Sequence, residues 1–150
     1  MSLDDGVYST WEVELAARHP LALSEMRWPS VPLGRPETPA LARWGLEVRS
    51  GWRGIVEQLL DRLEAFIAAQ PADCRDRYRI VQLKEKFGRL VVYLAATPTA
   101  EMRAEIQTAE NASVVTCEVC GHPGRLAERR GWHSTRCPAH ESWSPWDRLD

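Results

Sequence analysis

The chain has 150 residues, of which 44% are hydrophobic and 27% are charged, and its formal net charge at pH 7 is −2. This size predicts a single globular domain with room for a small attached metal-binding lobe. The near-neutral, evenly mixed charge argues against binding of nucleic acid through a broad basic surface. No apolar run is long enough to cross a bilayer, so we expect no membrane contact. The first residues lack a basic and apolar signal segment, so we expect a cytoplasmic protein with reduced thiols.

The first third of the sequence predicts a helix followed by a proline-rich arm. Residues 1–19 have helical character, with Ser9 or Thr10 as the N-cap. Five prolines within residues 20–39 disfavour a helix, so we expect an extended arm on the surface. The sequence from 40 to 49 predicts a short helix or a strand.

The middle of the chain alternates between helix and strand patterns. Apolar residues at helical spacing predict a packing helix over Gly54–Gln70. Two β-rich runs, 78–84 and 89–94, predict a hairpin whose turn spans Glu85–Gly88, with Val81 and Leu83 on one face. A further helix should then reach about residue 112, with Thr97 as its N-cap and Pro98 at its first position. These elements predict an α+β body over residues 1–115, in which helices pack on a small antiparallel sheet.

Two pairs of metal-binding residues stand near the C-terminus. Cys117 and Cys120 form a Cys-x-x-Cys-Gly turn, and Cys137 and His140 form a second pair after sixteen intervening residues. Three thiolates and one imidazole at such spacing are typical of a structural Zn²⁺ site. We therefore expect zinc as the cofactor.

The sequence between the two pairs predicts a β-hairpin. Its strands are Arg125–Arg129 and Trp132–Arg136, and its turn is at Arg130-Gly131. Residues 137–140 can then begin a helix, because proline is tolerated in a first helical turn. Knuckle, hairpin and helix start, in this order, predict a treble-clef-like zinc-binding lobe over residues 116–150 that is docked on the body.

Two alternatives to this ligand set remain open. The four cysteines of the chain could form two disulfides in a secreted protein, although we expect no secretion signal. The fourth ligand could also be another residue than His140, and the candidates are Cys74, His122 and His133.

Three blocks of the sequence together resemble a family of small, mostly uncharacterised bacterial and phage proteins with a zinc-ribbon-like segment. The blocks contain Gly51-Trp52 before a helix, Lys86-Phe-Gly88 in a hairpin, and Cys117-Glu-Val-Cys-Gly followed by Gly131-Trp132, Cys137 and His140. The resemblance covers about residues 44–140. The chain departs from the family pattern at Val48, where a cysteine is frequent, and at Arg89, where a second glycine is. The resemblance implies zinc binding and an α+β layout, and an accessory or immunity role is suggested by the family's phage and toxin-locus context.

The sequence gives little sign of catalysis. A catalytic zinc usually keeps one coordination position open and has a carboxylate base nearby. Here a fourth ligand is available, and the His-Glu-x-x-His and zinc-deaminase motifs are absent. Only if His140 were not a ligand could Glu141 act as a base beside a zinc-bound water. We therefore predict that the chain is not an enzyme.

The function we expect is that of a zinc-stabilised protein-binding module, of the inhibitor or immunity type or a phage accessory protein. Tryptophan and arginine dominate the energetics of protein interfaces, and the chain has seven tryptophans. The candidate contact residues are Trp28, Arg129, Arg130, Trp132, Trp143 and Trp146.

The alternative function is a nucleic-acid-binding zinc finger. Its contacts would come from the hairpin arginines Arg125, Arg129, Arg130 and Arg136. With three zinc-bound thiolates counted, residues 117–140 carry roughly +1, which is too little for the several phosphate contacts that affinity requires. Lys84, Lys86 and Arg89 beside Phe87 form a second weak patch of this kind.

Overall fold

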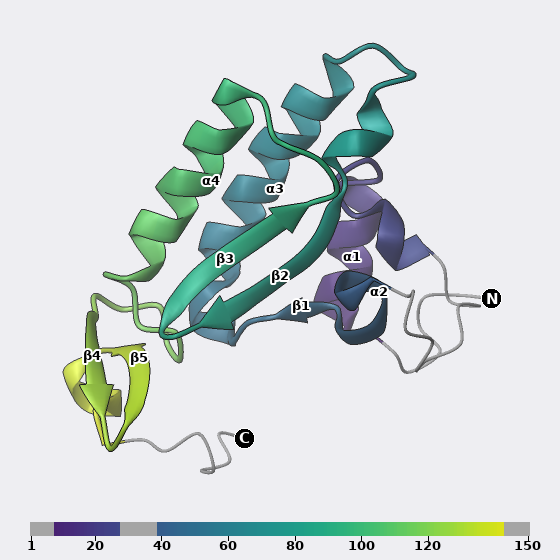
Figure 1. Ribbon diagram of the computed structural model, residues 1–150. Coiled ribbons are helices and arrows are strands. Elements are labelled where there is room, and N and C mark those ends of the chain that lie inside the picture. The colour runs from purple at the N-terminus through teal and green to yellow at the C-terminus, as the bar shows by residue number, and fades with distance from the viewer. Residues whose placement is uncertain (1–7, 28–38, 143–150) are drawn as a thin grey trace.

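The structure, a computed structural model, describes residues 8–27 and 39–142. It is an α+β fold, in which helices cover one face of a small sheet and a second hairpin extends from one end (Figure 1). No helix within the described ranges is long and apolar enough to cross a membrane. Trp28, Trp143 and Trp146 lie outside these ranges, as does most of the predicted arm.

The regular elements follow the order that the sequence predicts, with additions. The α-helices are α1 (Thr10–Arg18), α2 (Ala40–Trp44), α3 (Arg53–Ala68) and α4 (Ala100–Ser113). The strands are β1 (Leu46–Glu47), β2 (Ile80–Lys86), β3 (Arg89–Leu94), β4 (Arg125–Arg129) and β5 (Trp132–Arg136). Short 3₁₀ turns are η1 (Ser24–Arg27), η2 (Ser50–Trp52), η3 (Arg75–Tyr78) and η4 (Pro138–His140).

Helix α1 begins at a capping box. The Ser9 hydroxyl accepts from the backbone N–H of Glu12, and the Glu12 carboxylate accepts from the backbone N–H of Ser9. The second carboxylate oxygen of Glu12 accepts from the N–H of Leu46 at 2.8 Å, which ties this helix to β1. Ser9 is therefore confirmed as one of the two predicted N-caps.

Within the described residues, the main sheet has three strands in the order β1-β2-β3, with β1 parallel to β2 and β2 antiparallel to β3. The prediction that Val81 and Leu83 lie on the same face of the strand is wrong. A bulge between Ile80 and Gln82 shifts the alternation of side chains between the two faces of the sheet. Ile80 and Leu83 are the buried residues of this strand. The hairpin turn is also tighter than predicted, with only Phe87 and Gly88 between the strands.

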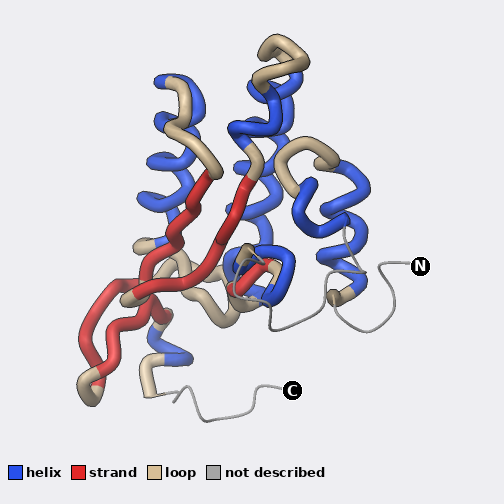
Figure 2. Tube along the Cα trace, turned by 45° about the vertical axis from the view of Figure 1, so that its right-hand side comes forward, coloured by secondary structure: helices blue, strands red, loops and turns tan. Residues whose placement is uncertain are grey.

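The core lies between this sheet and the helices behind it (Figure 2). Helix α3 contributes the apolar stripe that its sequence predicts, and it packs beside α4. Trp52, which directly precedes α3, is fully buried at the base of this core. The buried residues of the stripe are Val56, Leu59, Leu60, Leu63 and Ile67.

Two further local predictions are wrong. Helix α4 begins two residues later than expected, and its N-cap is Thr99, whose hydroxyl accepts from the N–H of Met102. Thr97 and Pro98 instead belong to the preceding loop. Within the predicted arm, residues 24–27 form the 3₁₀ turn η1 rather than an extended segment. Met26 and Leu23 are fully buried there, so hydrophobic burial fixes this stretch.

Candidate metal centre

The four side chains of the predicted zinc site meet at one point. The ligand atoms of Cys117, Cys120, Cys137 and His140 all lie within 4.8 Å of one another. Cys117 and Cys120 come from the knuckle, the turn of residues 117–121 that follows α4. Cys137 directly precedes η4, the turn that follows β5, and His140 is the last residue of that turn. The four residues therefore form a cluster compatible with a metal site.

Three of the distances within the cluster are close to those of tetrahedral zinc coordination. Zn²⁺ bonds of about 2.3 Å to sulfur and about 2.0 Å to nitrogen place two sulfurs about 3.8 Å apart, and sulfur and nitrogen about 3.5 Å apart. The Sγ atoms of Cys120 and Cys137 are 3.6 Å apart, and the Nδ1 atom of His140 lies 3.7 Å from Sγ of Cys117 and 3.2 Å from Sγ of Cys137. These three separations are compatible with a metal ion held through Nδ1 of His140.

The electrostatics of the cluster favour a bound cation. Burial alone would raise the pKa of the Cys117 thiol, but hydrogen bonds from backbone N–H groups, including those of Cys137 and Cys120, lower that pKa to about 6. A backbone hydrogen bond at His122 lowers the pKa of Cys120, but burial and the neighbouring sulfurs of Cys137 and Cys117 outweigh it and raise that pKa. A thiolate at Cys117 therefore makes a second thiolate at Cys120 less favourable. A divalent cation removes this repulsion.

Contacts from residues outside the ligand set orient the ligands. Nδ1 of His122 lies 3.2 Å from Sγ of Cys120 and can donate to this thiolate without joining the ligand group. Arg136 is buried and donates from Nη2 to Oε1 of Glu118 at 3.0 Å and from Nη1 to the His140 carbonyl at 3.4 Å. This guanidinium thus joins the knuckle to the turn that carries the histidine.

The knuckle is fixed to the body by the residues that precede α3. The N–H of Gly51 donates to the carbonyl of Glu118 at 2.9 Å, and the indole N–H of Trp52 donates to the carbonyl of Thr116 at 2.8 Å. The hydroxyl of Ser50 donates to the carbonyl of Val119 at 3.1 Å. Three successive residues of the body therefore bind the backbone on both sides of the first ligand.

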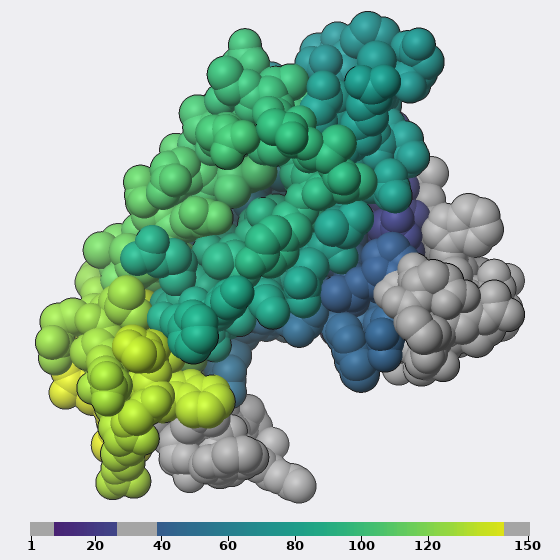
Figure 3. All heavy atoms as spheres, in the orientation of Figure 1, coloured from purple at the N-terminus to yellow at the C-terminus, as the bar shows by residue number. Residues whose placement is uncertain are grey.

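The β2–β3 turn is the second connection between body and lobe. The hydroxyl of Thr135 on β5 donates to the carbonyl of Gly88 at 2.7 Å, and both groups are buried. Phe87 and His133 meet edge to face with ring centroids 6.0 Å apart. Figure 2 shows this turn against the β4–β5 hairpin, and Figure 3 shows the two segments in contact at the surface.

The geometry decides between the candidate fourth ligands. Within the described residues, His140 is the one that completes a group of four, and neither Cys74, His122 nor His133 belongs to that group. Cys74 lies between α3 and η3 and contacts Asp73. All four cysteines are free, so the disulfide alternative has no pair in this structure.

The hairpin of the lobe has the predicted strands and the predicted turn at Arg130-Gly131. After Cys137 the structure has one 3₁₀ turn, η4, where the sequence predicts a helix start. Knuckle, hairpin and helical turn thus follow the treble-clef order as far as Ser142, where the described residues end.

The predicted contact residues differ in their surroundings. Trp132 and Arg130 are exposed, whereas the Nη1 atom of Arg129 donates to the carbonyl of Ser134 at 2.8 Å. Sequence reasoning placed Phe87 in a weak nucleic-acid patch but not among the protein-contact residues, although its side chain is 70% exposed and its ring contacts His133 of the lobe's hairpin. Its place in a tight turn next to a glycine is the signal that could have indicated exposure.

The centre is thus a Cys₃His cluster clamped between two parts of the body. Comparisons of the chain with protein-family models, with curated proteins and with solved structures found no match.

Proposed function

We propose that the chain is a zinc-stabilised, non-catalytic protein-binding module, acting in a reducing, cytoplasmic compartment as an inhibitor or immunity-type protein. The four-residue ligand set supports a structural zinc, because a catalytic zinc keeps one position open for water or substrate. The clamps from Gly51, Trp52 and Gly88 support the same role, since they make the lobe part of the fold.

The observation that carries the binding proposal is an aromatic groove between the two hairpin tips. Phe87 is 70% exposed and Trp132 is 50% exposed, and both line a pocket of about 380 Å³ together with Lys86, Gly131 and His133. Large exposed aromatics that adjoin one another are typical of binding surfaces rather than of free protein surface. The metal cluster lies at the base of the lobe that carries Trp132, and it thereby holds one wall of the groove.

The conformation of Phe87 adds to this argument. Its φ angle is 53°, in the left-handed region that asparagine or glycine normally occupies at this position of a tight hairpin turn. A bulky aromatic residue is unfavourable there on conformational grounds alone, and its ring is left largely in solvent. Such a residue is best explained by a contact that it makes with another molecule.

The rim of the groove indicates the chemistry of the partner. Lys86 lines the groove and pairs across the sheet with Arg89, and Arg130 adjoins its other wall. The acid on the groove wall, Glu85, accepts from the N–H of Gly88. A protein segment with an apolar side chain flanked by carboxylates would complement an aromatic groove with this rim.

Nucleic acid is the second candidate, because the fold brings the basic residues of both hairpins together around aromatic rings. Two of the arginines that would serve it are used in the fold. Arg136 is buried against Glu118, and Arg129 donates to the Ser134 carbonyl. The remaining exposed cations are too few for a continuous phosphate track, so we favour a protein partner.

The metal part of the proposal is tested by metal analysis of purified protein. We expect about one equivalent of zinc per chain, and loss of that zinc together with the fold of the lobe in Cys117→Ser. Cys74→Ser is the matched control, because Cys74 is outside the cluster. Full metal loading of a Cys117→Ser, Cys137→Ser double variant would disprove the ligand assignment.

The binding part is tested by capture from a bacterial lysate followed by titration of the recovered partner. We expect Trp132→Ala and Phe87→Ala each to weaken binding at least about 30-fold, since truncating a central aromatic anchor typically costs 2 kcal/mol or more. Trp44→Ala is the control, because Trp44 is 63% exposed but lies on α2, away from the groove.

The outcomes separate the two candidate functions. Nuclease-sensitive capture that weakens steeply with salt would favour the nucleic-acid function. A protein partner that binds both groove variants as tightly as it binds Trp44→Ala would contradict the assignment of the groove.

A further inference from the structure

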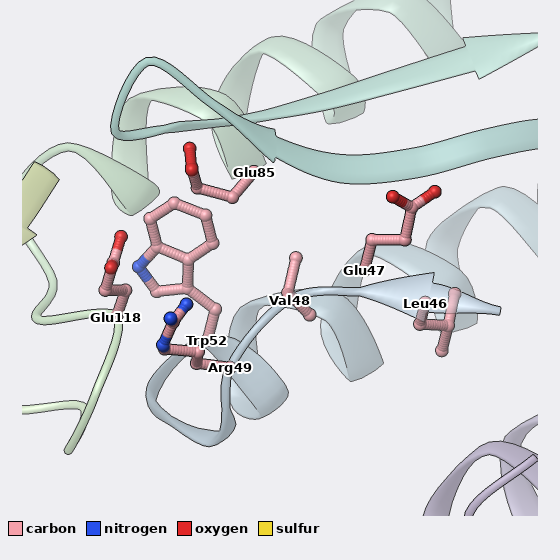
Figure 4. A pocket seen from close by; sticks show the side chains of 7 residues that line it. All are labelled: Leu46, Glu47, Val48, Arg49, Trp52, Glu85 and Glu118. Carbon is pink, nitrogen blue, oxygen red and sulfur yellow. The ribbon is translucent and has the colours of Figure 1, made fainter. Parts of the chain in front are cut away.

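The two outer strands of the main sheet differ in how they are protected from further pairing. An uncovered strand edge offers backbone N–H and C=O groups to another chain, and short strands and charged side chains guard against this. The β1 edge has both devices, because it is two residues long and Figure 4 shows Glu47 on it and Arg49 in the segment that follows. The β3 edge is six residues long, and only its first residue, Arg89, is charged. Within the described residues, β3 pairs with no strand other than β2.

The tight hairpin turn determines which backbone groups of β3 point outward. The residues that flank a two-residue turn are hydrogen-bonded to each other, and bonded pairs alternate along an antiparallel ladder. Leu90, Val92 and Leu94 therefore turn their N–H groups away from β2. The N–H of Leu90 agrees with this, because it donates to the hydroxyl of Ser113 on α4 at 3.0 Å. The outward N–H groups of Val92 and Leu94 have no such acceptor among the described residues.

Helix α4 runs beside this edge, and a groove of about 500 Å³ lies between them (Figure 1). This β3 edge groove is lined by Val92–Leu94, by residues 95–98 and by one side of α4. The helix is antiparallel to the strand, since residues 95–99 join the end of β3 to the start of α4 and the bond to Ser113 joins their other ends. A groove of this volume is within the range of ligand-binding sites, which is roughly 300–1,000 Å³.

The helical wall of the groove carries one cation and one anion. Arg103 lies toward the end of β3 and Glu110 toward its start, about 10 Å apart along the helix axis, with Ile106 between them. Neither charged side chain forms an ion pair or a hydrogen bond within the described residues. Burial raises the pKa of Glu110, although Arg89 nearby opposes this, so the carboxylate is partly withdrawn from water. The groove thus has a basic end and an acidic end.

These features together favour an extended peptide as the ligand. A strand that adds to a sheet edge gains affinity from main-chain hydrogen bonds and specificity from alternate side chains. Every second side chain of such a strand faces α4, and two of them four residues apart are separated by about 13 Å. Long charged side chains at these two positions can reach Arg103 and Glu110, and the residue midway between them lies over Ile106.

We propose that the β3 edge groove binds an extended segment of another protein, which adds to the sheet as a further strand antiparallel to β3. In this direction the segment begins beside Arg103 and ends beside Glu110. It therefore carries an acidic residue first, an apolar residue in the middle and a basic residue last. Antiparallel pairing is assigned because it is the more stable of the two directions per residue. The groove shares no lining residue with the aromatic groove and does not require that groove's partner.

The test is an NMR titration of the metal-loaded full chain with two capped pentapeptides at millimolar concentration, Glu-Thr-Val-Thr-Lys and Lys-Thr-Val-Thr-Glu. The two have the same composition, and we expect the first to bind about tenfold more tightly because its charges complement those of the groove. It should slow the exchange of the Val92 and Leu94 amide protons with solvent. The Leu90 amide is the internal control, because it already donates to Ser113. N-methylation of the peptide's valine, which lies opposite Val92, should abolish binding.

A charge-exchanged variant makes the result specific. Arg103→Glu combined with Glu110→Arg reverses the two ends of the groove without changing the net charge, and arginine and glutamate have similar helix propensities. This variant should bind the second peptide more tightly than the first. Glu101→Gln is the control, because Glu101 is exposed in the first turn of α4 and does not line the groove.

The possible outcomes are distinct. Absence of saturable shifts, equal binding of the two peptides, or an unchanged preference in the charge-exchanged variant would overturn the proposal. Binding that leaves the exchange of Val92 and Leu94 unaltered would exclude strand addition and overturn it as well. Protection of these two amides that increases with protein concentration in the absence of peptide would make a second copy of this chain the occupant, which would also contradict the proposal.

Discussion

Substituting Gly51 with alanine should separate the metal-binding lobe from the body, because the position has no room for a methyl group. A Cβ atom on Gly51 would overlap the carbonyl oxygen of Cys117 and would lie 2.5 Å from the carbonyl carbon of Glu118. These neighbours are backbone atoms of the knuckle, so no side-chain rotation can relieve the overlap. Either the start of α3 or the knuckle itself must move.

The cost of that movement can be worked out from the hydrogen bonds at the joint. Displacement breaks the bonds from Gly51 N–H to Glu118, from Ser50 to Val119 and from the Trp52 indole to Thr116. At about 1 kcal/mol each, their loss destabilises the protein by about 3 kcal/mol. The Trp52 indole is fully buried, so leaving its N–H without an acceptor adds to this figure.

The assay is denaturant unfolding, together with the rate at which a chromophoric chelator removes zinc. Gly51→Ala should lower the free energy of unfolding by about 3 kcal/mol and accelerate zinc loss. Gly54→Ala is the control, because its Cβ would meet no atom within 4 Å in helix α3, and alanine there should stabilise by about 0.5–1 kcal/mol. Equal stability of Gly51→Ala and the unmodified protein would refute the argument that the glycine is required by close packing.

Three further predictions concern pH, capping and the metal. The hydrogen bond from His19 lowers the pKa of Asp61, so its contribution to stability is complete above the unfolded value of about 3.9 and is lost as pH falls through the lowered pKa. Asp61→Asn should therefore cost at most about 1 kcal/mol at neutral pH, because the carboxylate is largely exposed, and acid titration of stability should show this difference vanish. Thr99→Ala should destabilise α4 by about 1 kcal/mol in thermal unfolding, whereas Thr97→Ala, outside the helix, should have little effect. Removal of the metal by a chelator should abolish hydrogen-exchange protection in residues 116–140 while α3 remains protected, and uniform loss of protection would contradict a local role for the metal.

The parts of the fold that sequence predicts well depend on local patterns. The apolar stripe of α3 repeats at helical spacing, so its buried face follows from the sequence alone. The ligand pairs are also local, since a Cys-x-x-Cys turn and Cys137 with His140 each bring two donors to one side of the chain. The ligand group could therefore be predicted, although the choice of the fourth ligand required the geometry.

The remainder depends on contacts between distant segments. The bulge before Gln82 reverses the strand's faces, and no residue in that strand marks its position. The helix cap is Thr99 rather than Thr97, two residues earlier. The sequence does not distinguish them, because either threonine can cap a helix. The meeting of Phe87 with the lobe's hairpin depends on how lobe and body dock, which spacing does not determine.

The three sequence blocks that carry the family resemblance converge on one joint. The first block supplies Gly51 and Trp52, the second supplies the Gly88 carbonyl, and the third supplies the backbone of the knuckle that receives the first block's donors. The donors and acceptors of these blocks bind one another, so folding alone accounts for these residues, without a binding partner. A metal in the Cys₃His cluster would hold the third block in the shape that the other two bind.

Function is then best sought in the groups near this joint that folding leaves unsatisfied. Phe87 holds an unfavourable backbone conformation and leaves most of its ring in solvent, and Trp132 lines the same pocket from the lobe. Glu118 uses one oxygen to bind Arg136, and its other oxygen is buried without a donor within the part of the chain that the structure describes. None of these features improves the stability of the isolated chain, and two of them reduce it. A binding partner that covers the aromatic rings would recover part of that lost stability, so it should raise the unfolding temperature when it binds.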